Sequence, residues 1–226
     1  MVPNFNCGTS LGPISFHEFI GDSWCVLFSH PADFTPVCTT EFGETAKLKL
    51  EWEKRNTVVI GLSVDNEEDH ARWIDDINRI CDCTVEFPII ADKDRKVSML
   101  FGMLDPTAFL AGPNAGETMT VRSVFIISPQ KRVELIISYP AHIGRNFDEI
   151  LRIIDALQLS VKYGVATPVN WRPGDDTVVL PFISDGDAEN MFEGGMRKVF
   201  IELTPPHSSF SPRCAQADIA LRPFSR

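Results

Sequence analysis

The sequence predicts an α/β protein, because segments with the pattern of buried strands alternate with segments that have helical spacing. One observation is the nearly continuous apolar, β-branched run Thr57–Asp65, which is typical of a strand covered on both faces. The second is a pair of strand-like segments joined by the short connection Pro129-Gln130-Lys131. The third is the helical recurrence of apolar residues over Asn146–Leu159. Together they predict a sheet with helices packed on it.

The first half of the chain supplies alternating strands and helices. The expected elements are, in order, a strand over Trp24–His30, a helix over Thr39–Arg55, a strand over Thr57–Asp65, a helix capped by Asn66, a short strand over Phe87–Ala91 and a short helix over Arg95–Phe101. In the first long helix, Phe42, Ala46 and Leu50 are predicted to share the inward face. In the next helix, Ile77 and Ile80 share a face with Trp73.

The second half of the chain begins with a predicted loop, because Met103–Met119 carries Pro and Gly residues. Val121–Ser128 and Val133–Ser138 are predicted to form a hairpin. The helix over Asn146–Leu159 follows, and this order of elements predicts a thioredoxin-like α/β sandwich.

Changes in composition divide the chain into three regions. Residues 1–159 contain all the elements of the predicted α/β domain, and residues 160–203 form an extension of different character. Residues 204–226 are rich in Pro and Ser and have little periodicity, so we expect a poorly ordered tail.

Composition limits the class of protein. With 44% hydrophobic and 23% charged residues among 226, the chain is typical of globular proteins. Its net charge of -10 argues against nucleic acid or an anionic membrane as a partner. No apolar run approaches the roughly 20 residues that span a bilayer, so we expect no integral membrane association. The start lacks a basic n-region and a long apolar h-region, so we expect no secretory signal. The six cysteines have no dense, regular spacing of the kind that disulfide-rich proteins show, so we expect a reducing compartment, the cytoplasm.

The stretch Ser29–Glu41 carries the chemistry, and it reads Ser-His-Pro-Ala-Asp-Phe-Thr-Pro-Val-Cys-Thr-Thr-Glu. Pro31 and Pro36 interrupt regular structure between the strand and the helix, so Cys38 falls at or near the first helical turn. Unpaired N–H groups and the helix dipole favour negative charge there. We therefore expect this thiol to lose its proton more easily than a free thiol, and the thiolate is the nucleophile.

The pattern Pro31-x-x-x-Thr35-x-x-Cys38 resembles the active-site motif of the peroxiredoxins, which are thiol peroxidases. The longer string from His30 to Glu41 resembles the 1-Cys, peroxiredoxin 6-like branch of that family. The resemblance implies a thioredoxin-like fold with a C-terminal arm, here residues 160–203, that packs across the partner in a homodimer. It implies neither a metal nor an organic cofactor. The alternative is a buried structural cysteine in a Pro-rich loop.

The resemblance assigns the catalytic roles. Cys38 attacks the peroxide, Thr35 and Arg122 hold the peroxide oxygens, and Pro31 shields the thiol. Arg122 stands at the start of a predicted buried strand, where an unpaired charge is costly, and its guanidinium can contact thiolate and peroxide together. The alternative for Arg122 is a strand-end side chain that reaches water.

Three further residues have supporting roles by the same resemblance. Glu41 follows Cys38 by one helical turn and is placed to orient Arg122 by a salt bridge, or it is simply an acid favoured by the helix dipole. Arg145 matches a second arginine near the family's site. His30 matches a histidine close to the cysteine, with a capping or packing role as the alternative.

The first reaction step leaves a sulfenic acid on Cys38. We find no Val-Cys-Pro stretch of the kind that resolves it in two-cysteine peroxiredoxins, and Cys214 lies in the atypical tail. An external thiol is therefore expected, which for the family usually means glutathione supplied with help from glutathione S-transferase. Cys81-x-Cys83 is a weak metal or redox signal, and packing at a helix end is favoured.

A second hypothesis is calcium-independent phospholipase A2-type acyl hydrolysis, which peroxiredoxin 6-like proteins carry on a Ser, a His and an Asp. The matching residues are Ser23 and His17, but the position of the Asp holds Gln130. An amide supplies no negative charge to support an imidazolium, so this activity is expected to be weak or absent.

A third hypothesis is a non-catalytic, chaperone-like binding protein with an inert thiol. The complete set of Pro31, Thr35, Cys38 and Arg122 argues against it. The favoured function is reduction of hydrogen peroxide and organic or phospholipid hydroperoxides, in antioxidant defence and redox homeostasis.

Overall fold

The structure is a computed structural model that describes residues 1–104, 118–191, 196–201 and 215–220. Contacts divide the chain into two units, Met1–Phe147 and Asp148–Arg226. Within the described ranges, no helix is both long enough and apolar enough to cross a membrane.

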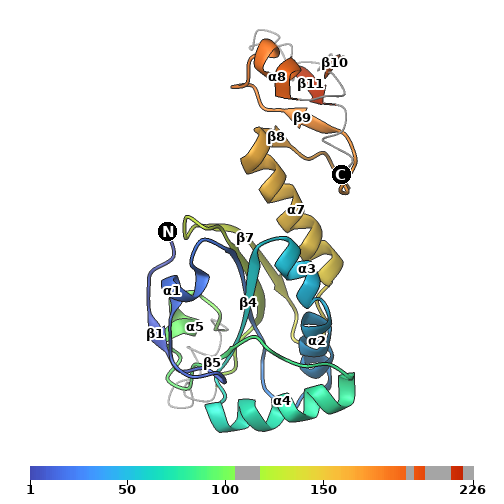
Figure 1. Cartoon of the computed structure of the whole chain (residues 1–226). Helices are drawn as coiled ribbons and strands as arrows, with labels where there is room; N and C mark the ends of the chain where they lie inside the picture. Colours follow the sequence, from blue (N-terminus) through green and yellow to red (C-terminus); the bar gives the residue numbers. More distant parts are fainter. Residues whose placement is uncertain (105–117, 192–195, 202–214, 221–226) are drawn as a thin grey trace, which may run out of the picture. The chain divides into compact units, whose positions relative to one another are not determined.

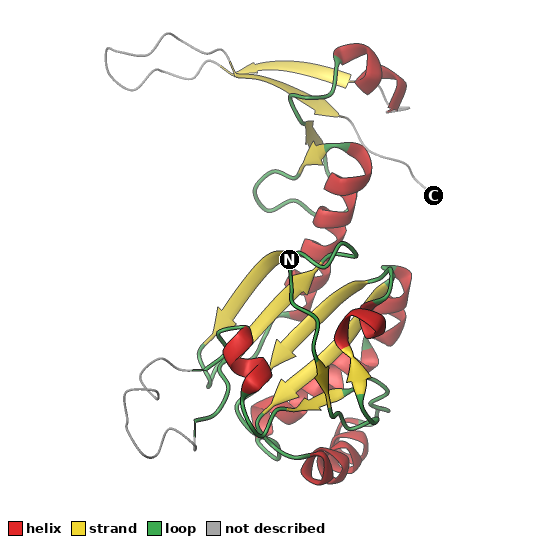
Figure 2. Cartoon of the chain, turned by 90° about the vertical axis from the view of Figure 1, so that its left-hand side faces the viewer, coloured by secondary structure: helices red, strands yellow, loops and turns green. Residues whose placement is uncertain are grey.

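A mixed sheet forms the centre of the first unit. In spatial order its strands are β5 (Ile89–Ala91), β4 (Thr57–Ser63), β3 (Trp24–Ser29), β6 (Arg122–Ile127) and β7 (Val133–Tyr139). Strands β3, β4 and β5 are parallel, whereas β6 and β7 are antiparallel additions next to β3. Figure 2 shows the strands side by side. Strand β3 is therefore central, and the loop that follows it leaves the sheet between a parallel and an antiparallel neighbour.

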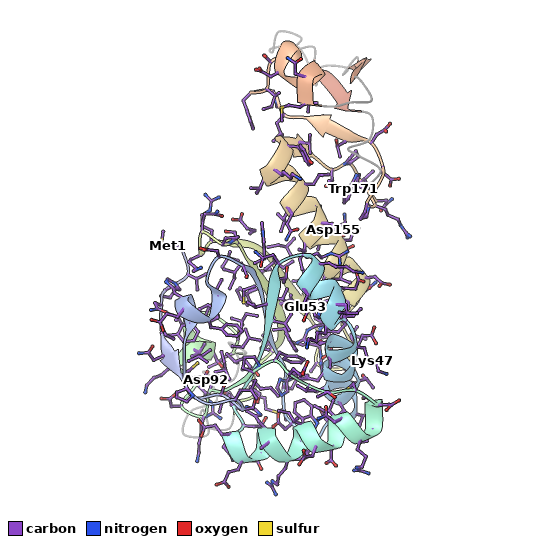
Figure 3. The ribbon with its side chains drawn as sticks, in the orientation of Figure 1. Met1, Lys47, Glu53, Asp92, Asp155 and Trp171 are labelled. Carbon is purple, nitrogen blue, oxygen red and sulfur yellow. The ribbon has the colours of Figure 1, made fainter. Side chains whose placement is uncertain are left out.

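Helices cover both faces of this sheet, and their bounds are α1 (Phe16–Ile20), α2 (Pro36–Lys47), α3 (Lys49–Lys54), α4 (Glu67–Cys81) and α5 (Lys96–Leu100). A short ribbon of β1 (Asn6–Cys7) and β2 (Ile14–Ser15) precedes α1. Figure 1 shows α1 and α5 on one side of the sheet and α2 and α3 on the other. The side chains fill the space between these layers (Figure 3).

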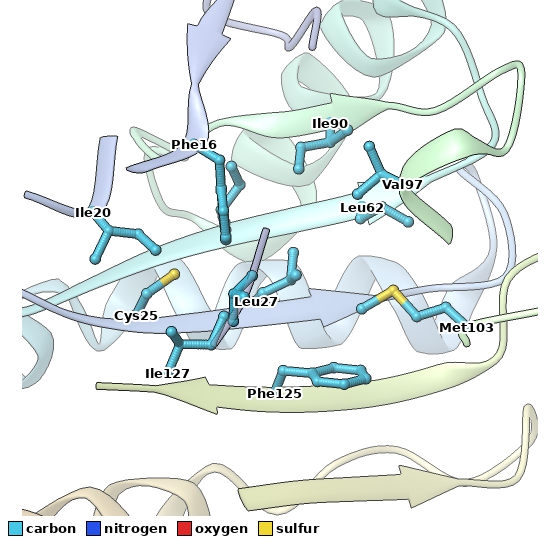
Figure 4. Close-up of a cluster of buried hydrophobic side chains, with 12 residues drawn as sticks. Phe16, Ile20, Cys25, Leu27, Leu62, Ile90, Val97, Met103, Phe125 and Ile127 are labelled. Atoms are coloured by element: carbon cyan, nitrogen blue, oxygen red, sulfur yellow. The ribbon is translucent and has the colours of Figure 1, made fainter. Parts of the chain in front are cut away.

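Two buried clusters follow from the alternation of side chains along β3. Cys25 and Leu27 point toward Phe16 and Ile20 of α1 in one cluster (Figure 4). Phe28 points to the other face, where its ring centroid lies 4.9 Å from that of Phe42 on α2. The same strand thus anchors the core on both sides of the sheet.

The predicted helix over Thr39–Arg55 is two helices, because the chain is interrupted at Leu48 between α2 and α3. Leu50 is 66% exposed and does not belong to the inward face that helical spacing predicted. Ile80, on the last turn of α4, is likewise exposed, whereas Trp73 and Ile77 are buried as predicted. The interruption at Leu48 changes which residues of α3 face inward, so Trp52 is buried in place of Leu50, whereas Ile80 lies at the end of its helix.

The predicted hairpin is present as β6 and β7, and Gln130 lies exposed in its turn. Of the predicted loop Met103–Met119, residues 105–117 lie outside the described residues. β7 is the edge of the sheet, and it exposes Val133 and Ile136.

The second unit contains a sheet of its own, together with α7 (Phe147–Tyr163, its first residue in the first unit) and α8 (Asp185–Met191). The sheet has the order β10 (Met196–Ile201), β11 (Ala215–Ala220), β9 (Thr177–Val179) and β8 (Val165–Ala166). Val165, Val179 and Ala188 are buried in its small core. Strand β11 falls within residues 204–226, where the sequence predicted no regular structure; the rest of that segment lies outside the described part of the chain.

Candidate active site

The loop between β3 and α2 places Cys38 in the first turn of a helix, as the two prolines predicted. Thr35 is the N-cap in an extended conformation, and Pro36 is the first helical residue. Cys38 follows two residues later and is fully buried. Phe34, just before the N-cap, has a φ of 57°, a left-handed value that an aromatic residue rarely adopts. The backbone is therefore bent sharply just before α2 begins.

Thr35 has its hydroxyl turned back into the loop, where Oγ1 donates a hydrogen bond to the carbonyl of Ala32 at 3.0 Å. Because the proton is used there, the lone pairs of Oγ1 remain as acceptors. Pro31, partly buried, lies in the same loop. The structure therefore gives the Thr35 hydroxyl a fixed orientation as a hydrogen-bond acceptor.

Arg122, the first residue of β6, reaches the sulfur of Cys38. Its Nη2 lies 3.5 Å from Sγ and also donates to the carbonyl of Ala141 at 2.7 Å. Its Nη1 forms an ion pair with Glu41. This arginine does not extend to water, because its side chain is only 2% exposed. A guanidinium fixed in this way can stabilise an anionic sulfur.

Glu41 holds a second arginine as well as the first. Its Oε2 accepts from Nη1 of Arg145 at 2.9 Å, and its Oε1 accepts from the backbone N–H of Arg145 at 2.7 Å. Arg145 also donates to the carbonyl of Ser29, the last residue of β3. Burial lowers the pKa of Arg145 to about 10, although Glu41 opposes this effect. The carboxylate thus fixes both arginines of the site.

The charged side chains beside the thiol do not balance one another. Arg122 and Arg145 carry two positive charges and Glu41 carries one negative charge, so their sum is +1. All three side chains are at most 3% exposed. An uncompensated buried charge is costly. These three side chains therefore place an excess of positive charge beside the sulfur of Cys38.

His30 lies in a buried chain of hydrogen bonds. Its Nε2 contacts Oδ1 of Asp33 at 2.7 Å, and Nδ1 of His70 contacts Oδ2 of the same carboxylate at 2.6 Å. The ring of His30 packs 4.7 Å from Phe42 and 4.9 Å from Trp73. Burial lowers the pKa of His30, although the hydrogen bond to Asp33 opposes the effect. His30 is thus a packed, neutral side chain with one specific polar partner.

His30, Asp33 and Asp65 lie close enough together to share a metal ion, because their candidate ligand atoms are within 4.8 Å of one another. Within the described residues, no other group of three or more His, Cys, Asp or Glu side chains is this compact. These atoms already have partners. Asp65 Oδ2 accepts from the backbone N–H of Asp33 at 2.9 Å and from Ser63 at 2.7 Å. We therefore assign the group to hydrogen bonding rather than to a metal.

The residues that match a lipase-like set have other partners. Ser23 donates its hydroxyl hydrogen bond to Oδ1 of Asn56 at 2.9 Å. His17 places Nε2 2.9 Å from the carbonyl of Val2. Neither of these contacts joins two members of the set, and Gln130 is exposed in a turn. No observation on these residues favours acyl hydrolysis.

Cys81 packs where the sequence favoured a role at a helix end. Its Sγ lies 3.6 Å from the carbonyl of Thr39. A Cβ at Gly43 would lie 2.5 Å from that sulfur, so the absence of a side chain there admits α4 against α2. Cys83 contacts the carbonyl of Ile77, and Cys214 lies outside the described residues. The contacts of Cys81 and Cys83 are structural.

Sequence reasoning missed the partners of His30. Asp33 lies inside the recognised string, but nothing in the string indicates that it pairs with histidines. His70 is 37 positions away, on α4, and no local pattern links the two. The signal available was a histidine on the helix face that also carries the buried residues Trp73 and Ile77.

Comparison with known families and structures gives consistent results. Residues 1–136 match the model of the AhpC/TSA family, and residues 156–195 match the C-terminal domain of 1-Cys peroxiredoxin. Peroxiredoxin-6 of Homo sapiens is 50% identical over 200 residues, which are 87% of this chain and 88% of the relative. The 1-Cys peroxiredoxin of Dictyostelium discoideum is 48% identical over 207 residues, which are 91% of this chain and 83% of the relative.

Two solved structures are similar over nearly the whole chain. A cysteine-to-serine mutant of peroxiredoxin 6 from Arenicola marina has a TM-score of 0.86 at 40% identity, covering 100% of this chain and 98% of that one. A yeast mitochondrial 1-Cys peroxiredoxin, whose thiol is described as resolved via glutathione/thioredoxin systems, has a TM-score of 0.77 at 43% identity. The coverage there is 97% of this chain and 96% of that one.

Proposed function

The chain belongs to the AhpC/TSA family and, within it, to the 1-Cys peroxiredoxins, so it is a thiol peroxidase, and we propose that Cys38 is the thiol that reacts with peroxide. The observation that carries this assignment is the contact of 3.5 Å between Nη2 of Arg122 and Sγ of Cys38. The net positive, buried cluster around the sulfur supports it, because that cluster favours the nucleophilic thiolate.

In the proposed reaction, the Cys38 thiolate attacks one oxygen of a peroxide and the O–O bond breaks. The attacked oxygen becomes the sulfenic acid, and the departing oxygen leaves as water or an alcohol after it takes a proton. Arg122 stabilises the negative charge that moves from sulfur to the departing oxygen. Thr35 accepts a hydrogen bond from the peroxide O–H, Pro31 shields the sulfur from water, and Glu41 and Arg145 fix Arg122.

The proposed substrates are hydrogen peroxide and organic hydroperoxides, including those of phospholipids. The test is consumption of hydrogen peroxide by the pre-reduced protein beside Cys38→Ser, with dimedone to trap the sulfenic acid. We expect rapid consumption and a single dimedone adduct on Cys38 in the natural sequence, and neither in the variant. Equal consumption by both proteins would contradict the assignment.

We further propose that an external thiol restores Cys38, and that this thiol is glutathione, assisted by glutathione S-transferase. A first thiol converts the sulfenic acid into a mixed disulfide and water, and a second releases Cys38 with formation of a free disulfide. The similar yeast protein, whose thiol is resolved via glutathione/thioredoxin systems, supports this class of reductant. Turnover with glutathione, with and without the transferase, and with thioredoxin distinguishes the sources.

We propose that residues 1–159 form the peroxidase domain and that residues 160–203 form an arm that joins two chains into a homodimer. The exposed fractions of Val169 and Phe182, which are 88% and 75%, support it, because apolar side chains so exposed are typical of an interface. Light scattering should give twice the mass of one chain, and a lower mass for Phe182→Ser. A natural chain that stays monomeric at micromolar concentration would contradict the proposal.

The proposed compartment is the cytoplasm. Its support is the set of cysteines that the structure describes as free: Cys7, Cys25, Cys38, Cys81 and Cys83. Free thiols persist in a reducing compartment. Microscopy of the tagged full-length protein tests this placement, and accumulation in an organelle would contradict it.

A further inference from the structure

Ser29, the last residue of β3, forms hydrogen bonds on both sides of Arg122. Its Oγ donates to the backbone carbonyl of Val121 and accepts from the backbone N–H of Ser123 at 3.2 Å. These two residues directly precede and follow Arg122 in the chain. Ser29 itself is fully buried. One hydroxyl therefore bridges the backbone around the arginine that reaches the sulfur of Cys38.

The direction of the two hydrogen bonds follows from the atoms involved. A carbonyl oxygen only accepts and a backbone N–H only donates, whereas a hydroxyl does both. The hydroxyl hydrogen of Ser29 therefore points to Val121, and one of its lone pairs receives the N–H of Ser123. A side chain without a hydroxyl would remove this partner from two backbone groups at once, and polar groups that lose a partner in the interior are costly.

The backbone is bent at the point that Ser29 bridges. The carbonyl and the N–H on either side of Arg122 also contact each other, with the nitrogen 3.2 Å from the oxygen. A contact of this kind between residues two positions apart closes a γ-turn, and Arg122 is its central residue. The register of β3 and β6 ends with Phe28 opposite Val124, just before this point. The side chain of Ser29 therefore joins the two strands where their regular pairing ends.

The place of this bend determines where the guanidinium of Arg122 lies. Its nitrogens contact three groups from different parts of the chain: Sγ of Cys38 at 3.5 Å, the carbonyl of Ala141 at 2.7 Å and the carboxylate of Glu41. A planar group held by three partners has little freedom to follow a shift of its own backbone. A displacement of the backbone at Arg122 would therefore loosen at least one of these contacts, and small errors of position are costly in catalysis.

The main chain of Ser29 contacts the second arginine of the site. Its carbonyl accepts a hydrogen bond from Nη2 of Arg145, whose Nη1 lies 2.9 Å from Oε2 of Glu41. This contact involves the backbone of Ser29 and not its hydroxyl. Replacement of the side chain alone therefore leaves the bond to Arg145 in place and removes only the bridge around Arg122.

We propose that Ser29 is a positioning residue of the peroxidase site, whose hydroxyl fixes the backbone on both sides of Arg122 and so sets the distance from the guanidinium to the sulfur of Cys38. The inference rests on the proposed role of Cys38. The hydroxyl exchanges no proton with the peroxide, because its hydrogen is used on the carbonyl of Val121. It acts only through Arg122.

The test is a double-mutant cycle between Ser29→Ala and Arg122→Lys in the full chain. The measured quantity is the second-order rate constant of the pre-reduced protein with hydrogen peroxide, by stopped flow. We expect Ser29→Ala to lower it by about tenfold in the natural sequence, because a displaced guanidinium stabilises the departing oxygen less well. In Arg122→Lys the same substitution should lower it by less than about twofold, because the fork that Ser29 positions is already absent.

A general structural role of Ser29 would give the same factor in both backgrounds, and that result would overturn the proposal. Ser29→Thr retains the hydroxyl, so we expect its rate constant to lie within about twofold of that of the natural chain. A folded Ser29→Thr that is as slow as Ser29→Ala would contradict the proposal as well. If Ser29→Ala does not fold, Ser29→Cys takes its place in the cycle, because a thiol is only a weak donor and acceptor.

The matched control is Ser128→Ala, beyond the opposite end of β6. Ser128 is also buried, and its hydroxyl likewise contacts a backbone carbonyl and a backbone N–H, both of Arg132 and both at 3.4 Å. We expect its rate constant to equal that of the natural chain, with thermal unfolding to show that each variant is folded. A loss of rate like that of Ser29→Ala would overturn the proposal. Failure of the Cys38 assignment would show separately, as peroxide consumption retained in Cys38→Ser.

Discussion

Cys25 and Cys38 are two thiols of one strand-loop-helix unit, and both are fully buried. Cys25 lies on β3 in an apolar cluster with Ile20 and Leu27, and burial strongly raises its pKa. Cys38 lies beside Arg122 in a cluster with an excess of positive charge. Burial is equal in the two cases, so the fixed charges around the sulfur are the difference on which the proposed reactivity of Cys38 rests.

The strongest test of this comparison exchanges each sulfur for a hydroxyl in turn. We expect Cys38→Ser to lower the second-order rate constant for hydrogen peroxide by more than about 1000-fold, because no thiolate remains. Cys25→Ser should retain the activity, apart from a loss of stability of about 1–3 kcal/mol from burying a hydroxyl in an apolar cluster. Stopped-flow kinetics and thermal unfolding measure these effects. A large loss of activity in folded Cys25→Ser would break the comparison.

Glu41→Gln tests whether the charges of the cluster are linked. The variant leaves two buried guanidinium groups without their carboxylate, and breaking a buried pair costs about 3–5 kcal/mol of unfolding free energy. Urea unfolding at pH 7 measures the change. The control Glu44→Gln, exposed on the same helix, should stay within about 0.5 kcal/mol. Equal stability of the two variants would mean that the cluster is not linked through Glu41.

Arg122→Lys sharpens the comparison by keeping the charge while removing the fork of the guanidinium. A single ammonium cannot hold Glu41, the Ala141 carbonyl and Cys38 with the same geometry, so we expect kcat/KM for peroxide to fall about 100-fold. The control is Arg132→Lys, a side chain that is 65% exposed, and its kinetics should be unchanged. An unchanged rate in Arg122→Lys would show that charge alone is sufficient.

Cys7 offers a third thiol for a test against pH. Burial and the nearby charge of Asp92 raise its pKa to about 11, so its thiolate is a minor species below that pH. Its alkylation rate should therefore rise about tenfold per pH unit from pH 8 toward pH 11, in protein whose Cys38 has been replaced by Ser. Mass spectrometry of the alkylated peptide measures this. A plateau below pH 9 would contradict the effect of burial.

The smallest expected effect is that of Ser23→Ala. Ser23 is hydrogen-bonded to Asn56 rather than to a histidine, so ester hydrolysis should be at the background level with or without the hydroxyl. The assay compares hydrolysis of a phospholipid ester by both proteins. Robust hydrolysis that disappears in the variant would show that the lipase-like set functions after all.

Local patterns predicted much of this molecule, because they reflect the chain's own geometry. Pro31 and Pro36 interrupt regular structure, so the strand, the loop and the place of Cys38 in the first turn were confirmed. The predicted thioredoxin-like fold and the peroxiredoxin family are confirmed by the similar structures. The predicted ion pair of Glu41 with Arg122 is present.

What the sequence could not predict depends on distant parts of the chain. The pairing of Asp33 with His70 requires the loop after β3 to meet α4, and no spacing in the sequence indicates that contact. The break at Leu48 changes the inward face of α3 from Leu50 to Trp52, and the spacing of apolar residues alone does not reveal that break.

The excess of positive charge has a consequence for the catalytic cycle. In the proposed reaction, a thiolate on Cys38 balances the two arginines and Glu41, but the first product, a sulfenic acid, is uncharged. Each reaction with peroxide would therefore leave two buried arginines beside a single carboxylate. The external thiol that restores the thiolate also restores the second anion of the cluster, so the two arginines are balanced again only when the cycle is complete.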